Sequence, residues 1–181
     1  MQSVTVLNVA KDYPLGQKEH GVEFLFDNRH LYLRSPSQWA IQRVRDCIIH
    51  ATYDRMRDNS FTKIDSPVFT PTCAEDSTEL YKVTHTNDEE MFLSQSGQMY
   101  IEAAIAGHRN VYDFGPVFRA EKSKTRRHLN ELWMMDAEMA FCDFRQNMDI
   151  QEDLVRFIVT RVLEERAEEL KILERDTDKL R

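Results

Sequence analysis

Two β-rich runs, residues 111–119 and 129–142, constrain the fold of this chain more than any other feature. A polar stretch of nine residues, 120–128, separates them, so we predict a large antiparallel hairpin. Because side chains alternate along a strand, one face of the second run is predicted to be core, formed by Trp133, Met135, Ala137, Met139 and Phe141. The opposite face carries Asp136 and Glu138, with Asp113, Gly115 and Arg119 on the first strand.

The charged face and the loop each have two interpretations. An antiparallel sheet often leaves one face in water, whereas a glycine inside a strand, such as Gly115, often marks the close approach of a ligand. The loop 120–128 holds four cations and a histidine, although the chain carries a net charge of −7. One interpretation is that this local positive patch binds phosphate groups. The other is that it is a solvated turn rich in Lys and Arg, which has the same composition.

The remaining segments predict an α+β fold in which helices flank a mainly antiparallel sheet. A helix from Gln38 to about Arg57 has an apolar stripe, which lies either in the core or in an interface. The extended segment 61–69 contains Pro67, which cannot donate to a strand ladder and should lie at an edge or an interface. The other expected elements are strands at 1–9, 31–33 and 91–93, a connector at 12–21, a loop at 70–87, and helices at 97–106 and 150–170, the last opened by a capping box at Asp149 and Glu152.

Composition excludes several classes of protein. No apolar stretch approaches the roughly 18 residues that cross a bilayer, and the first residues lack the features of a signal peptide. The three cysteines are far apart and odd in number, which argues against a disulfide framework and is typical of a reducing compartment. We therefore expect a cytoplasmic protein with no membrane partner, which would contact nucleic acid only through a local patch.

Several sequence motifs occur together in a characteristic order. The run 114–129, FGPVFRAEKSKTRRHL, resembles motif 2 of class II aminoacyl-tRNA synthetases, within their aspartyl/asparaginyl group. Residues 28–34, Ser66–Pro67 at the end of motif 1, and 93–98 match in the same order, and residues 133–135 and 170–176 are similar to bacterial asparaginyl-tRNA synthetases. The resemblance implies the antiparallel sheet of that class, flanked by helices and incomplete at the C-terminus, because motif 3 is not in this chain. Residues 1–21 would be the end of an N-terminal OB (anticodon-binding) domain and a hinge, and residues 22–181 the N-terminal part of the catalytic domain.

This resemblance implies an enzyme that joins an amino acid to ATP, releases pyrophosphate and passes the acyl group to tRNA. Since the attacking carboxylate is already an anion, the site must supply positioning and positive charge rather than a base. By resemblance, Arg119 is the catalytic arginine at the α-phosphate. The other ATP-binding positions are Glu121 at the adenine amino group or the tRNA end, Arg127 and His128 at the γ-phosphate, and Leu132, where an aromatic residue usually covers adenine. Mg²⁺ is expected for the full-length enzyme, with no metal ligand assigned in this chain.

The resemblance also implies a set of amino-acid-binding residues. These are Glu75 in a loop that resembles a closing lid, Gln98, Ile101, Glu102, and Asp136 at the substrate's α-ammonium group. Aspartyl enzymes carry a lysine at the position of Ile101, and that lysine pairs with the substrate carboxylate. Without the cation aspartate loses its partner, whereas Glu102 can accept from a carboxamide and repels a carboxylate. An ordinary helical pair at 101 and 102, without ligand contact, is the other interpretation.

The sequence thus predicts an asparagine–tRNA ligase that acts on ATP, asparagine and tRNA-Asn and forms a homodimer around Pro67. The first alternative is an aspartyl-tRNA synthetase or a paralogue that amidates aspartate. The second is a non-catalytic remnant that dimerises or binds the tRNA end. Because motif 3 is missing, we expect this chain alone to have little ligase activity.

Overall fold

The computed structural model describes residues 3–16, 18–72, 74, 79–84, 89–120, 122, 125 and 128–180. It divides the chain into two compact units, one formed by Met1–Ala51 with Ile158–Arg181 and the other by Thr52–Phe157. Among the described residues, none of the helices combines the length and apolarity that crossing a membrane requires.

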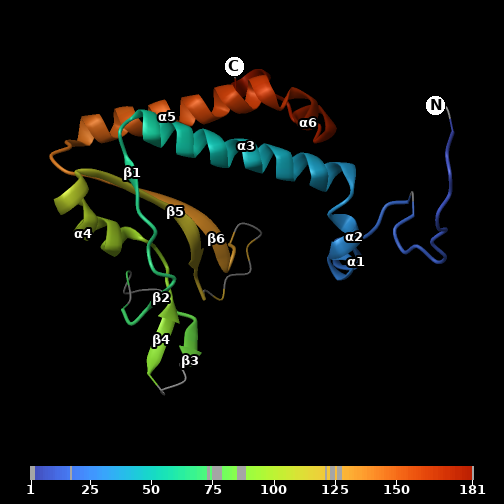
Figure 1. Cartoon of the computed structure of the whole chain (residues 1–181), viewed down its shortest axis with the longest axis horizontal. Coiled ribbons are helices and arrows are strands. Elements are labelled where there is room, and N and C mark those ends of the chain that lie inside the picture. Colours follow the sequence, from blue (N-terminus) through green and yellow to red (C-terminus); the bar gives the residue numbers. More distant parts are fainter. Residues whose placement is uncertain are drawn as a thin grey trace. The chain divides into compact units, whose positions relative to one another are not determined.

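The centre of the second unit is the predicted hairpin (Figure 1). Strand β5 (Asn110–Phe118) pairs antiparallel with β6 (Glu131–Met139), in a register that runs from Asn110 opposite Met139 to Phe118 opposite Glu131. The short strand β1 (Thr62–Lys63) joins β5 in parallel, which gives the sheet order β1-β5-β6. The prediction of the hairpin is therefore confirmed, and one parallel pair is added to it.

A smaller antiparallel sheet has the order β2-β4-β3, from β2 (Phe69–Thr70), β4 (Glu90–Leu93) and β3 (Lys82–Thr84). The prediction of a loop over 70–87 is wrong at β3, because three residues are too short for an alternating pattern to show. Ser94 connects the two sheets: its N–H donates to the carbonyl of Val68 at 2.8 Å, and its own carbonyl accepts from the N–H of Phe118 at 2.8 Å. Because β1 and β2 lie at sheet edges, the segment around Pro67 is at an edge, as predicted.

Helix α4 (Gln98–His108) contacts both β5 and β6 and buries Ile101 completely. On the other face of the hairpin, the ring of Tyr53 packs edge-on against Phe114 at 5.7 Å, and Phe114 packs against Trp133 at 5.5 Å. That second face was predicted to be entirely core, which is wrong: Trp133 is 45% exposed and Phe141 is 95% exposed. Alternation shows which side chains share a face, but it does not show how much of the face another element covers.

The long helices begin at local capping signals. Helix α3 (Pro36–Asp58) starts two residues before the predicted Gln38, with Pro36 in its opening turn, where proline is well tolerated. Helix α5 (Phe144–Glu165) starts six residues before the predicted start at Ile150, which was based on a capping box at Asp149 and Glu152. Its box is formed by Asp143 and Gln146: the Gln146 N–H donates to Asp143 Oδ1 at 2.9 Å, and the Asp143 N–H donates to Gln146 Oε1 at 3.0 Å. The predicted start was wrong because glutamine serves as well as glutamate in this motif.

The first unit contains α1 (Val22–Asp27), α2 (Arg29–Tyr32), the first part of α3, the last part of α5, α6 (Ala167–Ile172) and a 3₁₀ turn, η1 (Asp178–Leu180). In this unit α3 and α6 lie side by side (Figure 1), and Arg43 forms an ion pair with Glu169. The predicted strands at 1–9 and 31–33 are wrong, because residues 3–9 form no regular element and residues 31–32 belong to α2. Val4, Val6 and Val9 are exposed, so the alternation at the start of the chain covers no core in this unit.

Candidate functional site

The turn that precedes α4 brings predicted site residues together on the charged face of the hairpin. Ser96 Oγ donates to Asp136 Oδ2 at 2.9 Å, and the Gly97 N–H donates to the same oxygen at 3.3 Å. The Gln98 N–H donates to Ser96 Oγ at 3.0 Å. The carboxylate of Asp136 is therefore held at the N-terminus of α4, where the helix dipole favours negative charge. Within the described part of the chain no residue bonds to Asp136 Oδ1, so that oxygen is available to a ligand.

Gly97 packs closely against two neighbouring side chains. A Cβ at this position would lie 2.2 Å from Asp113 Oδ2 and 2.7 Å from Ser66 Oγ, both below any normal contact distance. Ser66 Oγ also donates to the Gly97 carbonyl at 3.4 Å. Asp113 lies directly opposite Asp136 in the β5–β6 register, so the two side chains share a face. Gly97 is thus bonded to one carboxylate and packed against another.

A group of acids continues along α4 and β6. Gln98 Nε2 donates to Glu102 Oε1 at 2.8 Å, one helical turn apart. Burial, and then the negative charges of Glu102 and Asp136, raise the pKa of Glu138 above its ordinary value. The structure therefore brings Gln98, Glu102 and Asp136 to one end of the hairpin. Ile101 is fully buried, which fits a packing role for that side chain.

Arg119 and Leu132 lie at the other end of the same face. The Arg119 N–H donates to the Asn130 carbonyl at 2.9 Å, which extends the ladder past the end of β5, and Leu132 lies opposite Val117. The Arg119 side chain is half-buried, with its Nε atom inside the protein. Arg119 lies six positions after Asp113 in the chain, which corresponds to about 20 Å in an extended strand. The face between Arg119 and Asp136 is long enough for a ligand with two differently charged ends.

The remaining predicted residues are distributed differently. His128 is exposed, and its Nδ1 atom lies in hydrogen-bond contact with Thr125 Oγ1. Pro67 is exposed next to Ser66. Glu75, Glu121 and Arg127 lie outside the described residues, so their predicted roles have no structural counterpart here.

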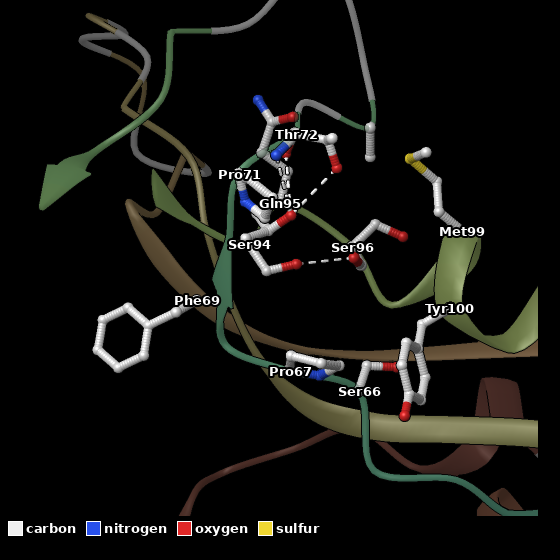
Figure 2. A pocket seen from close by; sticks show the side chains of 12 residues that line it. Ser66, Pro67, Phe69, Pro71, Thr72, Ser94, Gln95, Ser96, Met99 and Tyr100 are labelled. Atoms are coloured by element: carbon white, nitrogen blue, oxygen red, sulfur yellow. Dashed lines mark hydrogen bonds between the residues drawn. The ribbon is translucent and has the colours of Figure 1, made fainter. Parts of the chain in front are cut away.

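A pocket of about 280 Å³ lies between the strand segment 66–72, the turn 94–96 and the start of α4. Figure 2 shows Met99 and Tyr100 projecting from α4, with Ser94 and Ser96 joined by a hydrogen bond of 2.8 Å from Ser94 Oγ to the Ser96 carbonyl. Gln95, which is 2% exposed, also lines this pocket. The pocket therefore borders the turn that holds Asp136, on the side of the small sheet.

Sequence reasoning missed three residues of this arrangement: Asp113, Ser66 and Ser96. The alternation along β5 placed Asp113 on the charged face, but only the register shows that it lies opposite Asp136. Ser66 and Ser96 lay inside quoted motifs without a role. Among the described residues there is no group of three or more His, Cys, Asp or Glu side chains that could hold a metal ion.

Comparison with known proteins identifies the family. A family model of tRNA synthetases class II (D, K and N) matches residues 21–180. The chain belongs to this family. Its relatives are aminoacyl-tRNA synthetases, which are ligases, and the predicted fold class is confirmed by the solved structures that it matches.

The most informative solved structures are asparaginyl-tRNA synthetases. The enzyme from Pyrococcus horikoshii, complexed with asparaginyl-adenylate, is 34% identical with a TM-score of 0.90, over 96% of this chain and 40% of that one. The Entamoeba histolytica enzyme in complex with asparaginyl-adenylate is 29% identical with a TM-score of 0.76, over 86% of this chain and 35% of that one. A putative aspartyl-tRNA synthetase from Leishmania major Friedlin is 27% identical with a TM-score of 0.77, over 88% of this chain and 30% of that one. The chain thus spans well under half the length of these relatives, and its similarity to bacterial members in particular stays a prediction.

Proposed function

We propose that this chain is part of the catalytic domain of an asparagine–tRNA ligase, which activates asparagine with ATP and transfers it to tRNA-Asn. Family membership supports the ligase chemistry, and the P. horikoshii and E. histolytica synthetases complexed with asparaginyl-adenylate support the substrate. The observation that favours asparagine over aspartate as the substrate is Ile101. This fully buried apolar side chain stands where aspartyl enzymes have a lysine that binds the substrate carboxylate.

In the proposed first step, the carboxylate of asparagine attacks the α-phosphorus of ATP and pyrophosphate leaves. Negative charge develops on the α-phosphate oxygens, and the guanidinium of Arg119 would stabilise it, because its planar donors match phosphate geometry. Leu132 would cover one face of adenine from the same side of the sheet. Glu121 would contact the adenine amino group or the tRNA end, and Arg127 and His128 would hold the γ-phosphate.

The amino-acid end of the site would use the acids beside α4. Oδ1 of Asp136 would receive the α-ammonium group, because Oδ2 is already bonded to Ser96 and Gly97. Glu102 would accept from the carboxamide of asparagine, with Gln98 beside it and Glu75 closing over the substrate. A substrate carboxylate would meet negative charge at this wall, so the repulsion disfavours aspartate.

The same proposal extends to the longer protein. Residues 1–21 would be the end of an OB domain and a hinge, and residues 22–181 the N-terminal part of the catalytic domain. Pro67 would lie in a homodimer interface, and the enzyme would act in the cytoplasm. Mg²⁺ would act in the full-length enzyme, with no metal ligand assigned in this chain.

The decisive experiment is amino-acid-dependent ATP–pyrophosphate exchange by the product of the whole reading frame that contains this chain. We expect exchange with asparagine and none with aspartate. Exchange with aspartate alone would mean an aspartyl enzyme, and ammonia-dependent formation of asparagine from aspartate and ATP would mean an amidating paralogue. A folded product that catalyses no exchange, whichever amino acid is added, would mean a non-catalytic remnant.

A variant at position 101 tests the charge argument directly. Ile101→Lys restores the cation that aspartyl enzymes carry at this position, so kcat/KM for asparagine should fall at least tenfold while weak exchange with aspartate appears. Ala103→Lys adds the same charge at an exposed position of α4 and serves as the matched control. If both variants keep the parent preference for asparagine, position 101 does not determine the substrate.

A further inference from the structure

The backbone around Arg119 is held by hydrogen bonds to three other segments. The Arg119 N–H donates to the Asn130 carbonyl at 2.9 Å, and the next N–H, that of Ala120, donates to the Glu79 carbonyl at 3.1 Å. The N–H of the preceding residue, Phe118, donates to the turn before α4, as described above. Three consecutive N–H groups are therefore bonded, which fixes the peptide planes on both sides of the arginine. Since the backbone sets the direction of the Cα–Cβ bond, these contacts also fix where the Arg119 side chain starts.

Tyr81 links two of these acceptor segments. Its hydroxyl oxygen accepts a hydrogen bond from Asn130 Nδ2, so Tyr81 holds the residue to which Arg119 donates. Tyr81 also lies two positions after Glu79, the acceptor of the Ala120 N–H. Bonds and chain together therefore close a ring, which we call the Arg119 ring and which has five named members: Arg119, Asn130, Tyr81, Glu79 and Ala120.

The small sheet gives Tyr81 a fixed position. The Tyr81 carbonyl accepts a hydrogen bond from the Leu93 N–H at 3.0 Å, immediately before the pairing of β3 with β4 begins at Lys82. A second contact between the same segments, the ion pair of Lys122 with Glu79 at 3.7 Å, joins side chains that are 88% and 66% exposed. Exposed ion pairs contribute little stability, so the Arg119 ring depends mainly on the backbone bond of Glu79 and on the Tyr81 hydroxyl.

We propose that Tyr81 is a positioning residue, which holds Arg119 at the α-phosphate of ATP through its bond to Asn130. The inference rests on the proposed function, because Arg119 meets ATP only in that proposal. A guanidinium stabilises the transition state best when its donors already point to the oxygens on which charge develops, and a small displacement of such a group lowers the rate. Tyr81 acts on Arg119 and not on the amino acid, so its role is the same whichever amino acid the longer enzyme activates.

The kinetic test uses Tyr81→Phe in the product of the whole reading frame, which removes only the hydroxyl. In ATP–pyrophosphate exchange, kcat per active site should fall about threefold to tenfold, the effect of one lost hydrogen bond, while KM for ATP and for the amino acid changes less than twofold. Tyr13→Phe, which removes a hydroxyl from an exposed tyrosine of the first unit, is the matched control and should keep the parent kcat. Asn130→Ala should cause the same fall, and the double variant Tyr81→Phe/Asn130→Ala no larger one, because both changes remove the same bond.

Hydrogen–deuterium exchange tests the Arg119 ring without reference to activity. In peptides that cover residues 118–120, Tyr81→Phe should speed amide exchange at least threefold, and Tyr13→Phe should leave it unchanged. The proposal is overturned if Tyr81→Phe keeps the parent kcat, if its loss lies only in KM, or if the two single effects multiply in the double variant.

The two measurements also separate this proposal from the proposed function. A parent that catalyses no exchange with any amino acid contradicts the proposed function. Faster amide exchange in Tyr81→Phe would then still support the role of Tyr81 in the Arg119 ring, and unchanged amide exchange would overturn it. Should Tyr81→Phe fail to fold, the same two measurements on Asn130→Ala decide.

Discussion

Gly97→Ala tests whether close packing holds the turn that positions Asp136. The added Cβ would lie 2.2 Å from Asp113 Oδ2, about 1.2 Å short of the 3.4 Å at which ordinary contact begins. Ser66 Oγ, at 2.7 Å, blocks a second direction. The backbone at Gly97 is in the right-handed helical region (φ −83°, ψ −5°), so alanine is conformationally acceptable and the effect is steric.

The size of the effect follows from two opposing terms. Overpacking in a close-packed site costs about 1–3 kcal/mol, whereas replacing glycine by alanine in a compatible conformation stabilises by about 0.4–1 kcal/mol through the unfolded chain. We expect a net loss of about 1–2 kcal/mol in the free energy of unfolding, or a fall of roughly 2–8 °C in melting temperature for a chain of this size. Urea unfolding followed by circular dichroism measures the first quantity and a thermal scan the second.

Gly107→Ala is the matched control, because a Cβ there meets nothing within 4 Å and the residue lies in α4, the helix that Gly97 caps. It should raise stability by about 0.5–1 kcal/mol. The double variant Gly97→Ala/Asp113→Ala should recover at least 1 kcal/mol relative to the sum of its single effects, since truncating Asp113 makes room. A Gly97→Ala variant as stable as the parent, or a double variant that shows no recovery, would refute the packing argument.

Three further predictions concern helix capping and charge. Asp143→Ala should lower the free energy of unfolding by about 1 kcal/mol, because it removes the cap of α5. Asp149→Ala should change the free energy of unfolding by less than about 0.5 kcal/mol. Equal effects of the two variants in urea unfolding would contradict the observed helix start. Burial raises the pKa of Glu138, so the stabilising contribution of this group is full below about pH 4.5 and is lost as pH rises through the folded-state pKa. Glu138→Gln should therefore be more stable than the parent at pH 7, and the difference in free energy of unfolding should disappear in acid. Hydrogen bonding from Arg55 lowers the pKa of Asp153. Asp153→Asn should therefore be less stable than the parent at pH 7 and equal to it once pH falls below the folded-state pKa. A difference in free energy of unfolding that persists at that low pH would exclude the ion pair as its cause.

The extent of successful sequence prediction differs between elements. The hairpin and α3 were predicted because long runs repeat their period many times, and alternation correctly placed Asp113 and Asp136 on one face. The start of α5 and the three-residue strand β3 were missed, because they depend on one side-chain pair and on a partner strand. The strand predicted at 1–9 failed for a related reason, since its apolar side chains have no surface to cover in their unit.

The amino-acid sequence alone determined the family, the two faces of the hairpin and the identity of the charged residues, because motifs and side-chain alternation are local properties of the chain. Tertiary structure decided which charges meet. The packing of α4 against β5 and β6 brings Ser96 and Gly97 to Asp136, encloses Asp113 beside a cavity and raises the pKa of Glu138. Burial and distance arise from segments far apart in sequence, and these two quantities decide whether a carboxylate faces water, another acid or a ligand.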